Sequence, residues 1–372
     1  MRNLSLQTPS AKRQKAVARW LLLGVAMLII QILLGGITRL TGSGLSITEW
    51  KPILGAVPPM NDAAWQAAFE KYKGIAQYRY LNAHFTLSDF KGIYFWEWAH
   101  REWARLVGVV FIIGFVWFLI KRYFNKEMVA PFVILFILGA LQGAVGWIMV
   151  QSGLNDTDLY VSHIRLSIHF MAALLLLCYT LWFALKLLVP GEERLSHAGF
   201  RNFTIIAITL LCLQLVYGAF MAGLKAAPVA PTWPTINGLW MPDQLHQYGG
   251  RTYEGLSAWT SHPIAVQLIH RSLAYILLIV IIAWVIVAGQ VSRQPSGRKL
   301  RSWRWWPLGL VLLQVVLGIF TVLHGAQTEA GKFGSFEILA LSHQLVATCM
   351  LMALVANLYL TRSGPGPGAS LS

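Results

Sequence analysis

The sequence predicts an all-α integral membrane protein with eight transmembrane helices, arranged as two parallel-repeat four-helix bundles. Three observations support this fold class. The 372 residues are 56% hydrophobic and only 12% charged, with a mean hydropathy of +0.57, which is not the composition of a water-soluble globular protein. Eight apolar runs are each about 20 residues long, enough to cross a bilayer. Short motifs in the first half of the chain also recur in the second half.

The eight apolar runs divide the chain into two halves of four expected helices each. Their approximate limits are 19–38, 99–120, 129–150, 163–189, 203–224, 263–289, 307–324 and 338–361. We therefore expect a tail (1–18), an N-terminal bundle (19–189), a linker (190–202), a C-terminal bundle (203–361) and a flexible Gly- and Pro-rich tail (362–372).

Lysine and arginine residues predict the orientation. They concentrate in the N-terminal tail and in the 121–128 and 290–306 loops, which we expect to be cytoplasmic. The long 39–92 and 225–262 loops then lie outside, and both termini lie inside. The net charge of +15 is mostly this topological signal and gives no argument for nucleic acid binding. The N-terminus is not expected to be a cleavable signal peptide, because the apolar run after it is long enough to span the membrane.

An internal repeat relates the two halves. Two motifs recur: the segment from Gln31 to Gly35 matches that from Gln214 to Gly218 at an offset of 183 residues, and the segment from Gln142 to Gly146 matches that from Gln314 to Gly318 at an offset of 172. Two histidines recur as well: His100 matches His270 at an offset of 170 residues, and His169 matches His343 at an offset of 174. Each repeat holds an even number of helices, so both halves enter the membrane in the same direction. We expect an axis along the membrane normal to relate them.

The four repeated histidines indicate haem binding. Each half offers two histidines, from its second and fourth helices, within about 10 Å of the outer surface by helical rise. Two imidazoles that face each other inside a four-helix bundle can fill both axial positions of a haem iron. Four arginines are candidates for pairing with the haem propionates, namely Arg101 and Arg271, which directly follow histidines, and also Arg39 and Arg165.

The remaining six histidines do not share the repeat pattern, and we expect them to be solvated or to lie at helix ends. They are His84, His163, His197, His246, His262 and His324. The three cysteines, Cys178, Cys212 and Cys349, fall inside expected helices, so we expect neither a structural disulfide nor a cysteine metal site.

One position distinguishes the two halves chemically. Glu97 lies three residues before His100, whereas Gln267 lies three residues before His270. A carboxylate can exchange protons and an amide cannot, so any acid–base chemistry belongs to the N-terminal half. The alternative is that Glu97 forms a structural salt bridge with a neighbouring arginine, Arg101 or Arg105.

Long ordered motifs also resemble a known family. They are Gly35 to Ser46, Trp50 to Gly55 with Pro58 and Pro59, Phe90 to Tyr94 with Glu97, His100 and Arg101, Met149 to Leu154, Thr232 to Pro234, and Gln267 to Arg271. From about residue 20 to 360 the chain resembles the haem A synthase family. The 39–92 loop contains no cysteine, so the chain is similar to the branch of that family without a cysteine pair in this loop.

This resemblance implies oxidation of the C8 methyl group of haem O to the formyl group of haem A, the cofactor of cytochrome c oxidase. It implies that His100 and His169 flank haem O, that His270 and His343 ligate a resident haem b (iron protoporphyrin IX), and that Glu97 serves the methyl oxidation. Haem O synthase (protoporphyrin farnesyl transferase), an electron donor and membrane lipid are the implied partners, in a bacterial plasma membrane or a mitochondrial inner membrane.

Two functions of other classes stay open from the residues alone. One is an electron-transfer cytochrome b in which both haems are permanent. The other is a transporter with parallel repeats, in which the histidines relay protons. Against the transporter, the expected helices of the two halves are not broken by Gly or Pro at matching positions, whereas such transporters often have broken helices at the substrate site.

Overall fold

A computed structural model describes residues 11–51, 54–243, 245–327 and 333–362. Within these ranges, eight helices are long and apolar enough to cross a membrane, which confirms the all-α membrane class. They are α1 (Ala11–Leu40), α3 (Leu87–Ile120), α4 (Lys126–Gln151), α5 (His163–Leu188), α6 (Ala198–Gly223), α8 (Pro263–Val291), α10 (Trp305–Leu323) and α11 (Ser335–Leu360). The tail residues 1–10 and 363–372, and residues 52–53 of the motif from Trp50 to Gly55, lie outside the described residues.

Several helices begin earlier than the apolar runs predicted. Helix α1 already starts inside the expected tail, and α6 starts inside the expected linker. Helix α3 starts at Leu87, so His100 lies about three and a half turns into it rather than close to its start. The start is set by a capping box, in which Thr86 and Asp89 bond each other's backbone N–H groups. A hydropathy window does not detect this signal, because the capped turns are polar.

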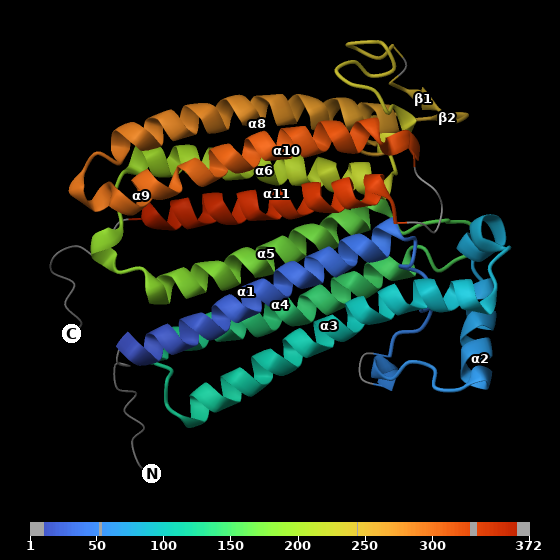
Figure 1. Cartoon of the computed structure of the whole chain (residues 1–372), viewed down its shortest axis with the longest axis horizontal. Helices are drawn as coiled ribbons and strands as arrows, with labels where there is room; N and C mark the ends of the chain where they lie inside the picture. The colour runs from blue at the N-terminus through green and yellow to red at the C-terminus, as the bar shows by residue number, and fades with distance from the viewer. Residues whose placement is uncertain (1–10, 52–53, 244, 328–332, 363–372) are drawn as a thin grey trace.

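The helices form two groups that lie side by side (Figure 1). In the first group α1 packs against α3 and α5, and α4 packs against α5; in the second, α6 packs against α8, and α10 packs against α8 and α11. The groups meet where α5 and α1 contact α6 and α11. A repeat axis along the membrane normal stays a prediction.

The largest buried cluster runs through both groups. It includes Val25 of α1, Leu177 of α5, Leu211 of α6, Trp284 of α8 and Leu351 of α11. This cluster therefore joins the two groups, whereas a second buried cluster, with Val17 of α1, Phe132 of α4 and Phe183 of α5, belongs to the first group. Helices α3 and α4 lie at the edge of the first group and expose large apolar side chains along most of their length, as expected for helices that face lipid.

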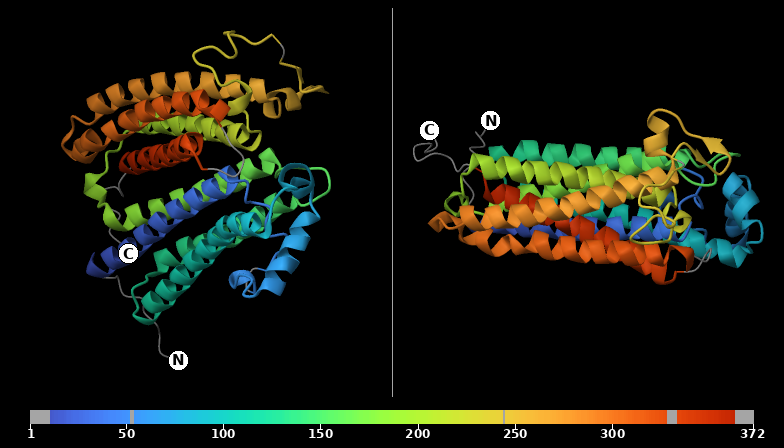
Figure 2. Two further views of the ribbon diagram at one scale, coloured as in Figure 1. Left: turned by 45° about the vertical axis from the view of Figure 1, so that its right-hand side comes forward. Right: turned by 90° about the horizontal axis from the view of Figure 1, so that it is seen from above.

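The long loops contain elements that the sequence did not predict. On one side these are α2 (Asp62–Lys73), a π-helical turn η2 (Tyr78–Asn82), α7 (Leu256–Thr260), and an antiparallel hairpin of β1 (Gln247–Tyr248) and β2 (Arg251–Thr252) with Gln247 paired to Thr252. Figure 2 shows α2 and the hairpin at the same end of the membrane helices. The other short elements are η1 (Leu54–Ala56), η3 (Gly191–Glu193), η4 (Ala227–Val229), η5 (Pro295–Gly297), α9 (Arg298–Trp303) and η6 (Gly325–Gln327).

The arrangement of loops gives a test of orientation. A reporter enzyme that works only outside the cytoplasm should be active when fused after residue 60 or 240 and silent when fused after residue 125 or 295, because lysine and arginine hold the second pair of loops inside. Reporter activity in membranes from cells that carry each fusion measures this. The opposite pattern would show that the assigned orientation is wrong.

Candidate functional site

In the N-terminal half, each repeated histidine contacts a glutamine of the helix that precedes it. The amide nitrogen of Gln31 on α1 lies 3.2 Å from Nδ1 and 3.3 Å from Nε2 of His100 on α3. The amide nitrogen of Gln142 on α4 lies 3.3 Å from Nδ1 of His169 on α5, and it also donates to the His169 carbonyl oxygen at 3.1 Å.

The C-terminal half repeats the arrangement. The amide nitrogen of Gln214 on α6 lies 3.4 Å from Nε2 of His270 on α8. The amide nitrogen of Gln314 on α10 lies 3.1 Å from Nε2 of His343 on α11. The ring centroids of His270 and His343 are 6.4 Å apart and their planes are inclined by 71°.

A glycine four residues after each glutamine lets the imidazole approach the preceding helix. The spacing of four places both residues on one helix face. A Cβ atom at these glycines would lie close to Cε1 of the facing histidine, at 3.1 Å for Gly35, 2.8 Å for Gly146, 3.3 Å for Gly218 and 3.0 Å for Gly318. Small residues that permit such close contact are typical of membrane helix interfaces. In each of four helix pairs, a repeated Gln and Gly motif on one helix therefore contacts a repeated histidine on the next.

The second pair fits a haem iron. An iron held between two imidazoles needs ring centres roughly 6 Å apart, since a metal–nitrogen bond is about 2 Å long. The 6.4 Å between His270 and His343 agrees with this requirement. The Nδ1 atoms of both rings are buried without a hydrogen-bond partner among the described residues.

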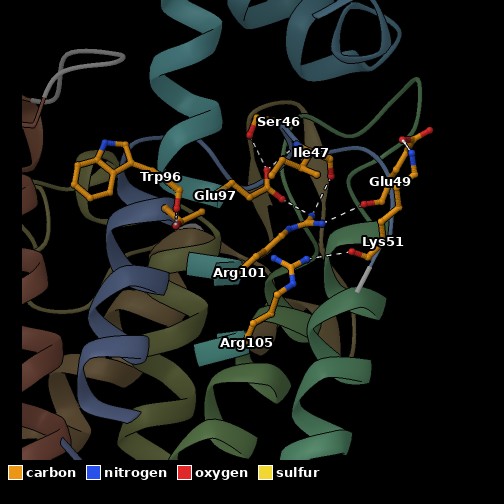
Figure 3. A network of polar contacts seen from close by, with 9 residues as sticks. Ser46, Ile47, Glu49, Lys51, Trp96, Glu97, Arg101 and Arg105 are labelled. Carbon is orange, nitrogen blue, oxygen red and sulfur yellow. Dashed lines mark hydrogen bonds and ion pairs between the residues drawn. The ribbon is translucent and has the colours of Figure 1, made fainter. Parts of the chain in front are cut away.

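Glu97 is buried and accepts three hydrogen bonds (Figure 3). Its Oε1 lies 2.5 Å from Nη2 of Arg101, which forms an ion pair one helical turn along α3. Its Oε2 accepts from the Ser46 hydroxyl at 2.7 Å and from the Ile47 backbone N–H at 2.8 Å. The alternative of a salt bridge with Arg101 is thus observed, and Glu97 also anchors the loop that follows α1.

Two arginines extend this anchoring. Arg101 donates to the carbonyl oxygens of residues 47 and 49 at 3.0 and 3.2 Å, and Arg105 donates to that of Lys51 at 3.1 Å. Arg105 forms its ion pair with Glu102 rather than with Glu97. Spaced by four residues, Glu97, Arg101 and Arg105 lie on one face of α3 and hold the 46–51 loop against it (Figure 3).

The same loop is tied to α2 by Glu49. Its carboxylate lies 2.8 Å from Nζ of Lys51 and 2.6 Å from Nζ of Lys71 on α2. Hydrogen bonds from Lys51 and Lys71 hold the pKa of Glu49 below its usual value. All three side chains are well exposed, so these contacts orient the loop more than they stabilise it.

The second half holds its loop in a related way. Arg271 donates to the carbonyl oxygens of Ala230, Thr232 and Thr235 at 3.2, 2.7 and 3.1 Å. Gln267, which occupies the position of Glu97, donates from its amide to the Ala230 oxygen at 3.0 Å. In both halves the residue three positions before the histidine and the arginine directly after it thus secure the loop that leaves the preceding membrane helix.

The four arginines considered for propionate binding all contact backbone oxygens. Arg39 donates to Ala222 at 3.3 Å, and Arg165 donates to Ile148 at 3.0 Å. A guanidinium has five N–H donors, so each arginine retains further donors. The Nε of Arg271 is buried without a partner among the described residues.

Most of the remaining histidines lie at helix ends. His197 and His262 accept hydrogen bonds from the first turns of α6 and α8. His163, at the start of α5, contacts the Ser261 hydroxyl at 3.2 Å, and His324, after α10, contacts the Phe320 carbonyl oxygen at 2.9 Å. These contacts are structural.

Comparison with known proteins identifies close similarity along nearly the whole chain. Residues 18–355 match the family model COX15-CtaA, described as cytochrome oxidase assembly protein. A protein named heme A synthase from Rhodospirillum centenum is 40% identical, over 96% of this chain and 91% of its own length. A protein of the same name from Caulobacter sp. is 42% identical, over 86% of this chain and 91% of its own length. Another from Flavobacterium johnsoniae is 36% identical, over 94% of this chain and 98% of its own length.

The glycine contacts lead to a stability prediction. Gly146→Ala should lower the free energy of unfolding by about 1–3 kcal/mol, because the new methyl group overlaps the His169 ring. Gly143→Ala on the same helix is the control: its Cβ meets open space, so alanine should be neutral or stabilise by up to about 1 kcal/mol. Thermal unfolding in detergent measures both. Equal unfolding midpoints for the two variants would contradict the observed contact.

Proposed function

The chain belongs to the COX15-CtaA family of cytochrome oxidase assembly proteins, and we propose that it is a haem A synthase. This membrane oxidoreductase oxidises the C8 methyl group of haem O to the formyl group of haem A for cytochrome c oxidase. The observation that carries the proposal is the set of two histidine pairs, each ring packed on a glutamine and a glycine, in a chain 36–42% identical to heme A synthases.

The two pairs take different roles in this proposal. His100 and His169 flank the substrate haem O, and His270 and His343 ligate a resident haem b. The 6.4 Å between the second pair of rings supports ligation. When bound, the haem iron supplies the redox chemistry, and the chain supplies the axial imidazoles and a buried setting from which the helices exclude water.

The arginines complete the binding of each haem. Arg101 and Arg271 directly follow the proposed ligand histidines. Arg39 lies at the end of α1, and Arg165 lies at the start of α5. We assign them to the propionates, since a guanidinium pairs strongly with a carboxylate. The buried Nε of Arg271, which has no partner among the described residues, supports this role, because a buried donor is costly without an acceptor.

Glu97 serves the oxidation of the methyl group in the N-terminal site. Its contacts with Arg101, Ser46 and Ile47 fix the position of the carboxylate. From that position it accepts a proton during oxidation or stabilises positive charge that develops on the substrate. Gln267 at the matching position has neither capacity, which fits a second site that only transfers electrons.

The membrane setting follows from the same assignments. We place both termini on the cytoplasmic or matrix side of a bacterial plasma membrane or mitochondrial inner membrane, and both histidine pairs toward the outer side. Haem O synthase supplies the substrate, and a separate electron donor supplies reducing equivalents.

A di-haem electron-transfer cytochrome b is the second candidate, and the likeness of the four histidine environments favours it. Extraction and mass identification of the haems separate the two functions. Haem b in both halves with no haem A product would support the cytochrome and overturn the synthase.

The resident haem gives a direct test of the ligands. His270→Ala should remove most of the low-spin haem b spectrum, because one of the two axial ligands is lost. The reduced-minus-oxidised spectrum of the purified protein measures this, and His197→Ala, which changes a helix cap only, is the control. A full b-type band in His270→Ala protein would show that this histidine is not a ligand.

If Glu97 acts in the oxidation, its substitution should impair conversion of haem O without affecting haem b binding. Glu97→Gln should keep the haem b band and lower haem O conversion by about 10² to 10⁴-fold, the usual cost of losing an acid–base group. Haem O or a hydroxylated intermediate should accumulate, as measured by chromatography of haems from cells with only this copy.

Ser46→Ala is the matched control, since it removes one hydrogen bond to Glu97 but keeps the carboxylate. It should retain most haem A synthesis. Normal haem A in the Glu97→Gln strain would leave Glu97 as a structural partner of Arg101. Equal losses in both variants would assign the effect to the loop rather than to the carboxylate.

A further inference from the structure

We propose that a groove between α8 and α10 binds an anionic phospholipid, with the lipid phosphate paired to Arg304 and an acyl chain lying along the two helices. Figure 1 shows α8 and α10 side by side, with α9 at the end where the groove lies. Val285 in the groove is about 22 Å along α8 from His270, by helical rise. The site is therefore separate from the histidine pairs.

The walls of the groove are apolar. Ile282, Val285 and Ile286 of α8 line it on one side, and Leu308 and Leu312 of α10 line it on the other, around a space of about 490 Å³. Ile286 is 58% exposed and Leu312 is 50% exposed, so the groove opens to the outside of the helix group. On a membrane helix such a surface meets lipid chains.

A single cation lies among these apolar side chains. The guanidinium carbon of Arg304 lies 4.7 Å from the centroid of the Trp305 ring, and Nη1 lies 3.5 Å from the Val285 carbonyl oxygen, a distance at the limit of a hydrogen bond. Its Nε is buried and has no hydrogen-bond partner among the described residues. Glu193 pairs with Lys299 rather than with this arginine. A buried donor and a cation at an apolar membrane surface both favour an anionic partner.

A glycine on α8 gives the guanidinium its position. A Cβ atom at Gly289 would overlap Nη1 of Arg304 and lie 2.9 Å from its Cζ. The repeat offset of 172 residues matches Arg304 with Phe132 of α4, which is buried in an apolar cluster. The helix arrangement itself therefore does not require a cation at this position, which indicates a role in binding.

Charge and depth identify the partner as a phospholipid. The adjoining loop and α9 carry three exposed arginines, Arg293, Arg298 and Arg301. Trp305 and Trp306 are 54% and 65% exposed, and exposed tryptophans mark the level of the lipid headgroups. Basic clusters beside membrane helices attract anionic lipids, and basic pockets between such helices bind their headgroups. The planar guanidinium of an arginine pairs with two phosphate oxygens at once.

The test compares two lipids. Protein purified in a non-ionic detergent is titrated with phosphatidylglycerol or with phosphatidylcholine of the same acyl chains, and native mass spectrometry counts the bound lipid. Both lipids contain a phosphate, but only phosphatidylglycerol has a net negative charge, so it should bind more tightly. Arg304→Gln should weaken its binding about 10 to 100-fold, the usual effect of losing hydrogen bonds to a charged group. Arg293→Gln, which removes an exposed charge from the same loop, is the control and should weaken it at most about fivefold.

A second pair of variants keeps every charge. Gly289→Ala forces the guanidinium away from α8, so it should also weaken phosphatidylglycerol binding, whereas Gly309→Ala on α10, whose Cβ meets open space, should not. This pair decides the question if Arg304→Gln does not fold.

Losses confined to Arg304→Gln and Gly289→Ala would support the proposal. Equal losses in Arg304→Gln and Arg293→Gln would overturn it, because they would show general attraction by charge. Equal binding of the two lipids by the parent protein would overturn it as well. So would displacement of the lipid by an equal concentration of inorganic phosphate, which would show a free-anion site, or dimers that only Arg304→Gln dissociates, which would identify a second copy of the chain as the occupant.

Discussion

The close contact between an imidazole and a glycine of the preceding helix is the interaction on which the rest of the structure depends. It occurs in the helix pairs α1–α3, α4–α5, α6–α8 and α10–α11. Association of membrane helices gains little from hydrophobicity, since lipid is as apolar as the side chains, so close packing and hydrogen bonds must hold the helices together. The same contact that joins each pair therefore also fixes where along the helices its histidine lies.

The two histidine pairs are also joined to each other through neighbouring residues. Gln344, next to His343, donates to the Ile32 carbonyl oxygen at 3.0 Å. Ile32 adjoins Gln31, which contacts His100. Gly36 permits this approach of α11 to α1, because a Cβ there would lie 2.8 Å from Leu341. The two pairs are thus connected through a short series of direct contacts between α11 and α1.

The sequence predicted the eight membrane helices because apolar content and length suffice for that inference. It did not predict the start of α3, which depends on the polar pair Thr86 and Asp89. It also did not predict α2, whose Phe69 and Tyr72 pack on the Phe90 ring of α3. The repeated Gln and Gly residues were visible as markers of the repeat. Their contact with the histidines was not, because spacing along one helix does not identify the residue that faces it. For Glu97 the sequence left a salt bridge and a catalytic role open, and the observed ion pair is compatible with both.

The difference between Glu97 and Gln267 extends into the loops that they hold. Glu97 accepts hydrogen bonds from the Ser46 hydroxyl and the Ile47 N–H, so the first loop presents donors to its helix. Gln267 donates to the Ala230 oxygen, so the second loop presents an acceptor. A carboxylate at residue 267 would face that oxygen with like partial charge, and burial would make the repulsion costly. The second loop therefore disfavours a carboxylate at residue 267, whereas the first loop presents donors that suit the carboxylate of Glu97. A carboxylate is consequently retained in one half and excluded from the other by backbone geometry, and this keeps two otherwise similar histidine pairs chemically distinct.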